Sequence, residues 1–173
     1  VIACSNLVNL LAGFNGLEAG TGIIISVFLV VILLITGLNQ NKVVAVFMLI
    51  SLIGALGAFM IFNWYPAKVF PGNIVTYLIG AVIAAAVIMG NIEKAGAILL
   101  LPQIIEFLLK SLSKFRAENF GTIVGGRLTY NGPVRSLTHL LMRRFRPTEV
   151  QLVAMIFVMQ VFAGLLAVAS VLT

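Results

Sequence analysis

Three asparagines and a run of glycines stand together near the start of the chain, in "NLVNLLAGFNGLEAG", residues 6–20. Asn6 and Asn9 are three positions apart, so on a helix their side chains share one face. Their amide oxygens could bind a hard cation, and their amide nitrogens could hold a phosphate. Hydrogen bonding between membrane helices is the alternative role for the same amides. Gly13 and Gly16 then allow tight turns and a close approach of the backbone to a ligand.

A second segment, "NWYPAKVFPGN" at residues 63–73, presents an aromatic side chain on a stiff loop. Its two prolines restrict the backbone, and Phe70 stands next to Gly72 and Asn73. A rigid, exposed aromatic ring can stack on a nucleobase. The aromatic side chains at the start of the segment have a second interpretation, as part of an interfacial aromatic belt.

The long segment 113–149 carries two further patterns. Residues 122–130, "TIVGGRLTY", predict a small β-hairpin that turns at its central pair of glycines. Residues 134–146, "VRSLTHLLMRRFR", set apolar side chains against arginines, which is typical of a basic helix at a membrane interface. An anchor of positive charge without a ligand is the alternative for this helix. For His139, the single histidine, we expect a surface role rather than catalysis.

The composition is that of an integral membrane protein. Of the 173 residues 61% are hydrophobic and 9% are charged, and the mean hydropathy is +1.17. A soluble domain carries about 25% charged residues. The single cysteine, Cys4, excludes an internal disulfide. The chain opens at Val1 inside an apolar run without the pattern of a signal peptide, so we expect it to be a piece of a longer protein.

We predict an all-α, polytopic transmembrane helix bundle with a small cytoplasmic β-hairpin and an interfacial helix. A membrane helix needs about 20 apolar residues, which allows five full spans and a partial one. Pro102 should kink the fourth span, and Glu106 should face the bundle interior or the interface. The full spans are about residues 21–38, 43–62, 74–90, 95–112 and 150–172, and residues 1–12 form the last turns of a sixth.

The basic residues give the orientation of these spans. Nine of the eleven lysines and arginines fall at one end of the bundle, which we expect to be cytoplasmic. The three segments with unusual chemistry lie at that same end. The nine are Lys68, Lys110, Lys114, Arg116, Arg127, Arg135, Arg143, Arg144 and Arg146, whereas Lys42 and Lys94 fall at the other end.

The two motifs, in this order and separated by two helices, resemble the polyprenyl-phosphate N-acetylhexosamine-1-phosphate transferase superfamily. Within it the chain is most similar to the UDP-N-acetylglucosamine–dolichyl-phosphate N-acetylglucosamine-phosphotransferases of the archaeal type. The resemblance covers nearly the whole chain. It implies that residues 1–173 form the C-terminal half of such a membrane enzyme, with residues 113–149 as its cytoplasmic loop.

The resemblance implies a reaction as well. UDP-GlcNAc would donate GlcNAc-1-phosphate to a polyprenyl or dolichyl phosphate and release UMP, as the first step of lipid-linked glycan assembly. The cofactor would be Mg²⁺, or Mn²⁺ in its place, on the pyrophosphate oxygens. A prokaryotic plasma membrane, most simply an archaeal one, is the expected location, because a eukaryotic-type insertion after the hairpin is missing.

The resemblance also assigns roles to residues. Asn9 matches a metal-binding asparagine of the family, and Asn73 stands where the family has a metal-binding aspartate. Gly13 and Asn15 match positions that contact uracil, and Phe70 matches the aromatic residue that stacks on it.

The chain departs from the family pattern in two ways. Asn73 offers a neutral oxygen, a poorer partner for a hard cation than a carboxylate, and the chain contains no aspartate at all. The resemblance implies that the family's paired aspartates lie in the N-terminal half, and the catalytic groups are left unassigned. In the sugar-binding loop, "KFRAEN" at residues 114–119 offers only Arg116 as a sugar or phosphate ligand. Asn6 and Glu18 are further candidates beside the metal and nucleotide.

Three hypotheses follow from these patterns. The first is the transferase half, whose partners would be UDP-GlcNAc, a polyprenyl phosphate, the lipid bilayer, the N-terminal half and a second copy in a homodimer, with no nucleic acid. The second is a non-catalytic relative that binds a nucleotide sugar or a membrane partner. The third is an unrelated transporter or structural bundle, for which an inverted repeat upstream would be the sign.

Overall fold

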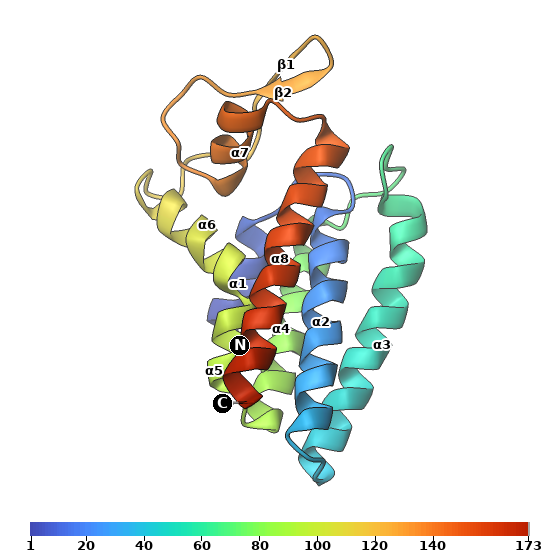
Figure 1. The fold of residues 1–173 in the computed structure, drawn as a ribbon. Helices are drawn as coiled ribbons and strands as arrows, with labels where there is room; N and C mark the ends of the chain where they lie inside the picture. The colour runs from blue at the N-terminus through green and yellow to red at the C-terminus, as the bar shows by residue number, and fades with distance from the viewer. Residues whose placement is uncertain (173) are drawn as a thin grey trace.

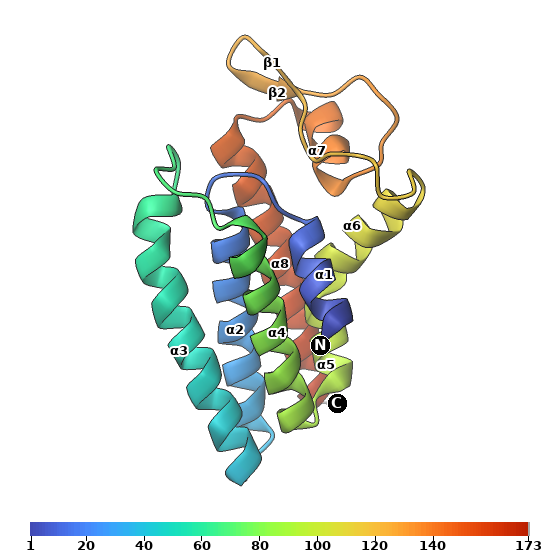
Figure 2. The same cartoon turned by 180° about the vertical axis from the view of Figure 1, so that it is seen from behind.

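In a computed structural model the chain is a bundle of long helices capped at one end by a small hairpin and a short helix (Figures 1 and 2). The structure describes residues 1–172. The two views agree that the α1–α2 loop, the α3–α4 loop and the segment between α6 and α8 lie at the same end. The elements are α1 Ile2–Leu10, α2 Leu17–Ile35, α3 Gln40–Asn63, α4 Gly72–Gly90, α5 Glu93–Leu99, α6 Leu101–Ser111, β1 Thr122–Val124, β2 Arg127–Thr129, α7 Leu137–Phe145 and α8 Glu149–Leu172.

The bundle packs around α2, which lies against α3, α4 and α8, while α1 lies against α4. Leu29 and Ile32 of α2 are fully buried, with Leu49 of α3 and Ile79 of α4 in the same cluster. Gly80 brings α4 close to α1, because a Cβ atom there would lie 2.5 Å from the Cα atom of Ser5. A small residue at this position therefore serves the close packing of α4 on α1.

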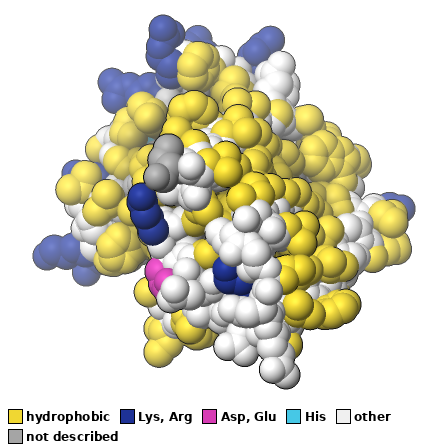
Figure 3. Space-filling view, turned by 60° about the horizontal axis from the view of Figure 1, so that its bottom comes forward, with side chains coloured by type: hydrophobic (Ala, Val, Ile, Leu, Met, Phe, Trp, Pro, Cys, Tyr) yellow, Lys and Arg dark blue, Asp and Glu magenta, His cyan; other side chains and the backbone are white. Residues whose placement is uncertain are grey.

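Four helices, α2, α3, α4 and α8, are long and apolar enough to cross a membrane. Hydrophobic side chains cover much of the face that Figure 3 shows. This fits the integral membrane protein that the composition indicates, whereas five full spans are not found among residues 1–172.

The predicted fourth span is two short helices instead of one, and the break falls close to Pro102, where the sequence predicts a kink. α5 ends at Leu99, and Pro102 lies in the first turn of α6, where its missing N–H is tolerated. The buried side chain of Gln160 on α8 donates to the carbonyl of Leu99 at 2.7 Å, and so satisfies an acceptor at the break. α6 then runs obliquely away from α5 (Figure 1).

The predicted hairpin is confirmed. β1 and β2 pair in antiparallel fashion, with Thr122 opposite Thr129. The connecting glycines have φ angles of 57° at Gly125 and 75° at Gly126, both in the left-handed region that a two-residue hairpin turn requires.

The predicted basic helix is also present, as α7, but its environment differs from the expectation. Leu137 and Met142 are buried against the start of α8, so this helix packs on the protein with one of its faces. His139 is only 2% exposed and stacks on Tyr130 with ring centroids 3.6 Å apart, so the expected surface role is wrong. The loop that holds Tyr130 folds over α7 and covers the imidazole.

Candidate active site

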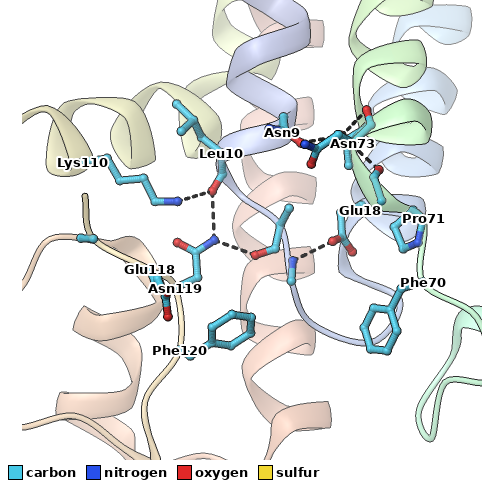
Figure 4. A pocket seen from close by; sticks show the side chains of 15 residues that line it. Asn9, Leu10, Glu18, Phe70, Pro71, Asn73, Lys110, Glu118, Asn119 and Phe120 are labelled. Atoms are coloured by element: carbon cyan, nitrogen blue, oxygen red, sulfur yellow. Dashed lines mark hydrogen bonds between the residues drawn. The ribbon is translucent and has the colours of Figure 1, made fainter. Parts of the chain in front are cut away.

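A cavity of about 400 Å³ opens at the end of the bundle where the unusual segments meet (Figure 4). It lies where α1 ends, where α4 begins and where α6 ends, and the loop before the hairpin closes its remaining side. Its walls thus come from four stretches that are far apart in the sequence. The lining residues are Asn9, Leu10, Ala12, Gly13, Glu18, Phe70, Pro71, Gly72, Asn73, Thr76, Lys110, Ala117, Glu118, Asn119 and Phe120.

Asn9 and Asn73 reach the same part of this cavity through Thr76. The Thr76 hydroxyl lies 2.6 Å from Asn9 Oδ1, to which it donates, and 2.9 Å from the backbone carbonyl of Asn73. The amide of Asn9 also lies 3.4 Å from the hydroxyl of Tyr77. The helix α4 begins at Gly72, so the side chain of Asn73 does not cap it. The amide of Asn73 is exposed and lines the cavity.

Glu18 is an acid buried at the wall of the cavity. It lies at the start of α2 and is 3% exposed. Its Oε1 accepts a hydrogen bond of 2.7 Å from the backbone N–H of Gly13, which holds the α1–α2 loop closed. Its Oε2 makes no hydrogen bond to any part of the chain that the structure describes. The carboxylate therefore keeps acceptor capacity for a ligand in the cavity.

Lys110 brings a positive charge to the opposite wall. Its ammonium donates to the carbonyl of Leu10 at 2.8 Å and lies 3.5 Å from Glu106 Oε1. Asn119 donates to the same carbonyl at 2.9 Å and to that of Ala12 at 2.6 Å. These bonds satisfy the C-terminal carbonyls of α1, which have no partner within the helix. An ammonium has three donors, so one N–H of Lys110 is left for a ligand.

Glu106 fixes the loop that carries Asn119. Its Oε2 accepts from the Ser136 hydroxyl at 3.0 Å and from the backbone N–H of Leu137 at 2.7 Å. The Thr138 hydroxyl in turn donates to the carbonyl of Asn119 at 2.7 Å. This acid faces the bundle interior, as the sequence predicts, and it joins α6 to the start of α7.

Two aromatic rings stand at the mouth of the cavity. Phe70 is 57% exposed and Phe120 is 52% exposed, and they lie on opposite sides of the opening in Figure 4. Phe120 packs on Phe14 with ring centroids 5.6 Å apart, and a Cβ atom at Gly13 would lie 2.9 Å from its ring. Two features favour glycine at position 13: the nearby Phe120 ring leaves little room for a side chain, and the φ of +110° is strained for other residues.

The structure brings five of the predicted site residues to this one cavity. They are Asn9, Gly13, Glu18, Phe70 and Asn73.

Three other predicted residues do not line the cavity. Asn6 is exposed, and its amide donates to the carbonyl of Ile2 in its own helix at 2.9 Å. Arg116 is exposed to solvent. Asn15 accepts from the backbone N–H of Ala67 at 2.8 Å, and both its backbone N–H and its side-chain amide donate to Glu149. Asn15 thus joins the α3–α4 loop to the start of α8, which is a structural role.

Sequence reasoning missed several residues of the cavity. Thr76, Lys110, Asn119 and Phe120 line it without having been singled out as ligands. The sequence contains an indication for Lys110. A lysine one turn after Glu106, at the end of an apolar span, suggests a buried ion pair. Asn119 and Phe120 follow the arginine that the family pattern favours, and only the fold of the loop reveals which of these side chains turns inward.

The oxygen atoms around Asn9 suit a hard cation, although they do not complete a site. Amide and carboxylate oxygens are the ligands that Mg²⁺ takes, and Glu18 Oε2 is a buried oxygen without a partner. Within residues 1–172 no three His, Cys, Asp or Glu side chains come together in a metal-binding group. A cation here would take further ligands from the substrate and from other parts of the protein.

His139 is the titratable group just behind the cavity loop. Burial lowers the pKa of its imidazole below the ordinary value, and the nearby charge of Lys110 acts in the same direction. The backbone at Phe120 and Glu118 opposes this shift but does not cancel it.

The two segments that supply Asn9, Gly13 and Phe70 both lie in the part of the chain that matches a known protein family. Residues 1–91, just over half of the chain, match the sequence profile of glycosyl transferase family 4. The chain belongs to glycosyl transferase family 4.

Individual known proteins resemble the chain over about half of its length or more. A protein of Saccharolobus solfataricus with the provisional name UDP-N-acetylglucosamine–dolichyl-phosphate N-acetylglucosaminephosphotransferase is 42% identical over 166 residues, which cover 95% of this chain and 51% of the relative. The Schizosaccharomyces pombe enzyme of that name is 31% identical over 115 residues, 62% of this chain and 26% of its own length. The phospho-N-acetylmuramoyl-pentapeptide-transferase of Prochlorococcus marinus is 40% identical over 91 residues, 53% of this chain and 24% of its own. The chain spans about half the length of the archaeal relatives that it matches.

Proposed function

We propose that the protein containing this chain transfers GlcNAc-1-phosphate from UDP-GlcNAc to a polyprenyl or dolichyl phosphate and releases UMP. The names of the archaeal and yeast relatives support this reaction. Since the chain matches about half of the archaeal relatives, we propose that it is the C-terminal half and that an N-terminal half completes the site. The reaction would take place at the cytoplasmic face of an archaeal or other prokaryotic plasma membrane, in a monomer or a homodimer.

One observation carries the proposal. Asn9, Lys110 and the neighbouring pair Phe70 and Asn73 come from three separate stretches, and they line one cavity at one end of a polytopic bundle. Oxygen ligands, a cation and an exposed aromatic ring are what a nucleotide sugar requires. A donor dissolved in water and an acceptor dissolved in the bilayer can meet only at such an end.

In this reaction an oxygen of the acceptor phosphate attacks the phosphorus that carries GlcNAc. A new P–O bond forms, the bond from that phosphorus to the bridging oxygen breaks, and UMP leaves with the electron pair. Catalysis of such a transfer rests on positioning and on stabilising charge on the phosphoryl oxygens. The free N–H of Lys110 would donate to one of those oxygens.

Mg²⁺, or Mn²⁺ in its place, would be held by Asn9, Asn73 and groups of the N-terminal half, with Glu18 nearby. When bound it would neutralise charge on the pyrophosphate. The hydrogen bond from Thr76 orients the amide of Asn9, so that one lone pair of Oδ1 remains for the cation.

Phe70 would stack on the uracil ring, and Phe120 would form the facing wall of the nucleotide pocket. Gly13 would let the base approach the backbone. Its N–H is engaged by Glu18, so any hydrogen bond from this loop to uracil would come from other atoms. Arg116, Asn6 and Asn15 are kept as proposed ligands only on the resemblance to the family, because they do not line the cavity.

A non-catalytic relative that binds a nucleotide sugar is the second candidate, and Asn73 in place of a charged ligand favours it. An assay of the full-length protein separates the two. We expect UMP and a GlcNAc-pyrophosphoryl lipid to appear from UDP-GlcNAc, Mg²⁺ and dolichyl phosphate, and Lys110→Met to lower turnover at least tenfold. Lys94→Met, at the other end of the bundle, is the matched control. Tight binding of UDP-GlcNAc with no lipid product would favour the non-catalytic relative instead.

A further inference from the structure

A second groove, of about 620 Å³, lies between α7 and the start of α8. It shares no lining residue with the cavity described above. Its walls include Arg127 of the hairpin, Leu141 and Phe145 of α7, and Met155, Val158 and Met159 of α8.

The groove is apolar along its length and runs in the direction of a membrane helix. The α8 side chains that line it extend from Gln151 to Met159, which is about 12 Å along the helix axis. Val158, near its inner end, is 68% exposed, and Phe145, near its outer end, is 55% exposed. Because α8 is one of the four candidate spans, this surface passes from the membrane interface into the hydrocarbon region.

The outer end of the groove is strongly basic. Arg127 lines it, and a guanidinium nitrogen of Arg127 lies 3.3 Å from the carbonyl of Arg146. Arg143 and Arg144 occupy the last turn of α7 and Arg146 follows it, although of these four arginines Arg127 alone lines the groove. All four are exposed, and in the described part of the chain the single ion pair is that of Lys110 with Glu106, so none of the four has a carboxylate partner. Glu149, the nearest acid in the sequence, is engaged by Asn15.

We propose that this groove binds an anionic membrane lipid, with one acyl chain along α8 and the headgroup phosphate held by Arg127, by Arg146 and by the arginines in the last turn of α7. The apolar wall below the arginines matches a chain, and the unpaired guanidinium groups above match a phosphate. A free phosphate would use only the outer end, and a neutral lipid would leave the four positive charges unused. The site is independent of the transferase reaction proposed above.

A photoreactive benzoylphenylalanine at Val158 in the full-length protein tests the proposal. The side chain at this position is exposed, so the substitution should leave folding intact, and benzoylphenylalanine at Phe145 serves if it does not. The protein is reconstituted in vesicles of phosphatidylcholine with or without phosphatidylglycerol, and the crosslinked products are weighed by mass spectrometry. We expect a lipid adduct in which phosphatidylglycerol is enriched at least fivefold over its share of the bilayer.

The double variant Arg127→Gln with Arg146→Gln should abolish that enrichment, while Lys94→Gln, an equally exposed charge at the other end of the bundle, should preserve it. Adducts that simply follow the bilayer composition would overturn the proposal. So would a crosslink to another segment of the protein, because the groove would then be a protein interface. UDP-GlcNAc binding is measured on the same samples. Lipid enrichment without UDP-GlcNAc binding would count against the transferase proposal and leave the lipid site standing.

Discussion

The hydroxyl of Thr76 donates to the amide oxygen of Asn9 across 2.6 Å and so joins the first turn of α4 to the last turn of α1. Thr76 is buried, and its hydroxyl also reaches the backbone carbonyl of Asn73 at 2.9 Å. The rotamer of one proposed metal ligand is thereby set by the helix that carries the other.

Thr76→Val should loosen Asn9 without changing the shape of the wall. A lost hydrogen bond of this kind is worth about 1 kcal/mol, so the Mg²⁺ concentration for half-maximal turnover should rise about fivefold. The control is Thr36→Val, at the end of α2 that lies away from the cavity. It also removes a partly buried hydroxyl group's bond to a backbone carbonyl, that of Ile32. Equal Mg²⁺ midpoints in wild type and Thr76→Val would show that Thr76 does not orient a metal ligand.

Asn73→Asp should lower the Mg²⁺ midpoint, because it replaces a neutral oxygen with a charged one, while Asn73→Ala should raise it or abolish turnover. A helix cap is no longer an alternative explanation for this residue, since α4 starts at Gly72 and Asn73 makes no capping hydrogen bond. A magnesium titration of the three proteins is the measurement. If both variants keep the wild-type midpoint, Asn73 does not bind the cation.

Phe70→Ala should weaken the binding of UDP-GlcNAc and of UMP by about 1–3 kcal/mol, by analogy with other stacked bases. Calorimetry on the folded full-length protein gives both affinities. Phe47→Ala removes an equally exposed ring from α3, away from the cavity, and should change neither affinity. Loss of affinity in both variants would point to a general effect on folding.

Residues 1–173 alone should not transfer sugar phosphate. Asn9 and Asn73, the proposed metal ligands, are both neutral, and residues 1–172 form no group of three His, Cys, Asp or Glu side chains, so we expect the N-terminal half to complete the cation site. Purified fragment, UDP-GlcNAc, Mg²⁺ and a polyprenyl phosphate are mixed and assayed for UMP. Turnover well above the protein-free reaction would mean that this half is sufficient.

Acidification should destabilise the segment around α7. The pKa of His139 is lowered in the folded state, so the unfolded state binds the extra proton more readily. The neutral imidazole of His139 contributes fully to stability above a pH of about 6.5, which is its pKa in the unfolded state. This contribution is lost as the pH falls toward the lower pKa of the folded state. His139→Phe keeps a ring against Tyr130 and should flatten the melting temperature between about pH 8 and pH 5. An unchanged pH dependence in this variant would assign the effect to other groups.

Much of this arrangement could be predicted from the sequence, because the patterns are local. The hairpin follows from two glycines between short β runs, and the interruption of the fourth span follows from Pro102. The residues at Asn9, Gly13, Phe70 and Asn73 were assigned by motif, and the structure brings all four to one cavity.

What could not be predicted depends on contacts between distant segments. Asn15 resembles a nucleotide ligand in sequence, yet Glu149, 134 positions later, engages it. Lys110 and Asn119 enter the cavity because both bind the carbonyl of Leu10, a backbone atom that no side-chain pattern reveals. His139 lies in an amphipathic pattern, and only the loop that returns over α7 buries it.

Glu106 holds the Leu137 N–H with one oxygen and faces Lys110 with the other, so a carboxylate of α6 fastens the segment that leads into α7. That coupling limits how relatives can be recombined. A chimera that receives only residues 113–149 from another member of the family would inherit a loop without the anchor for which it was shaped. A graft that begins before Glu106 would carry loop, anchor and lysine together as one unit.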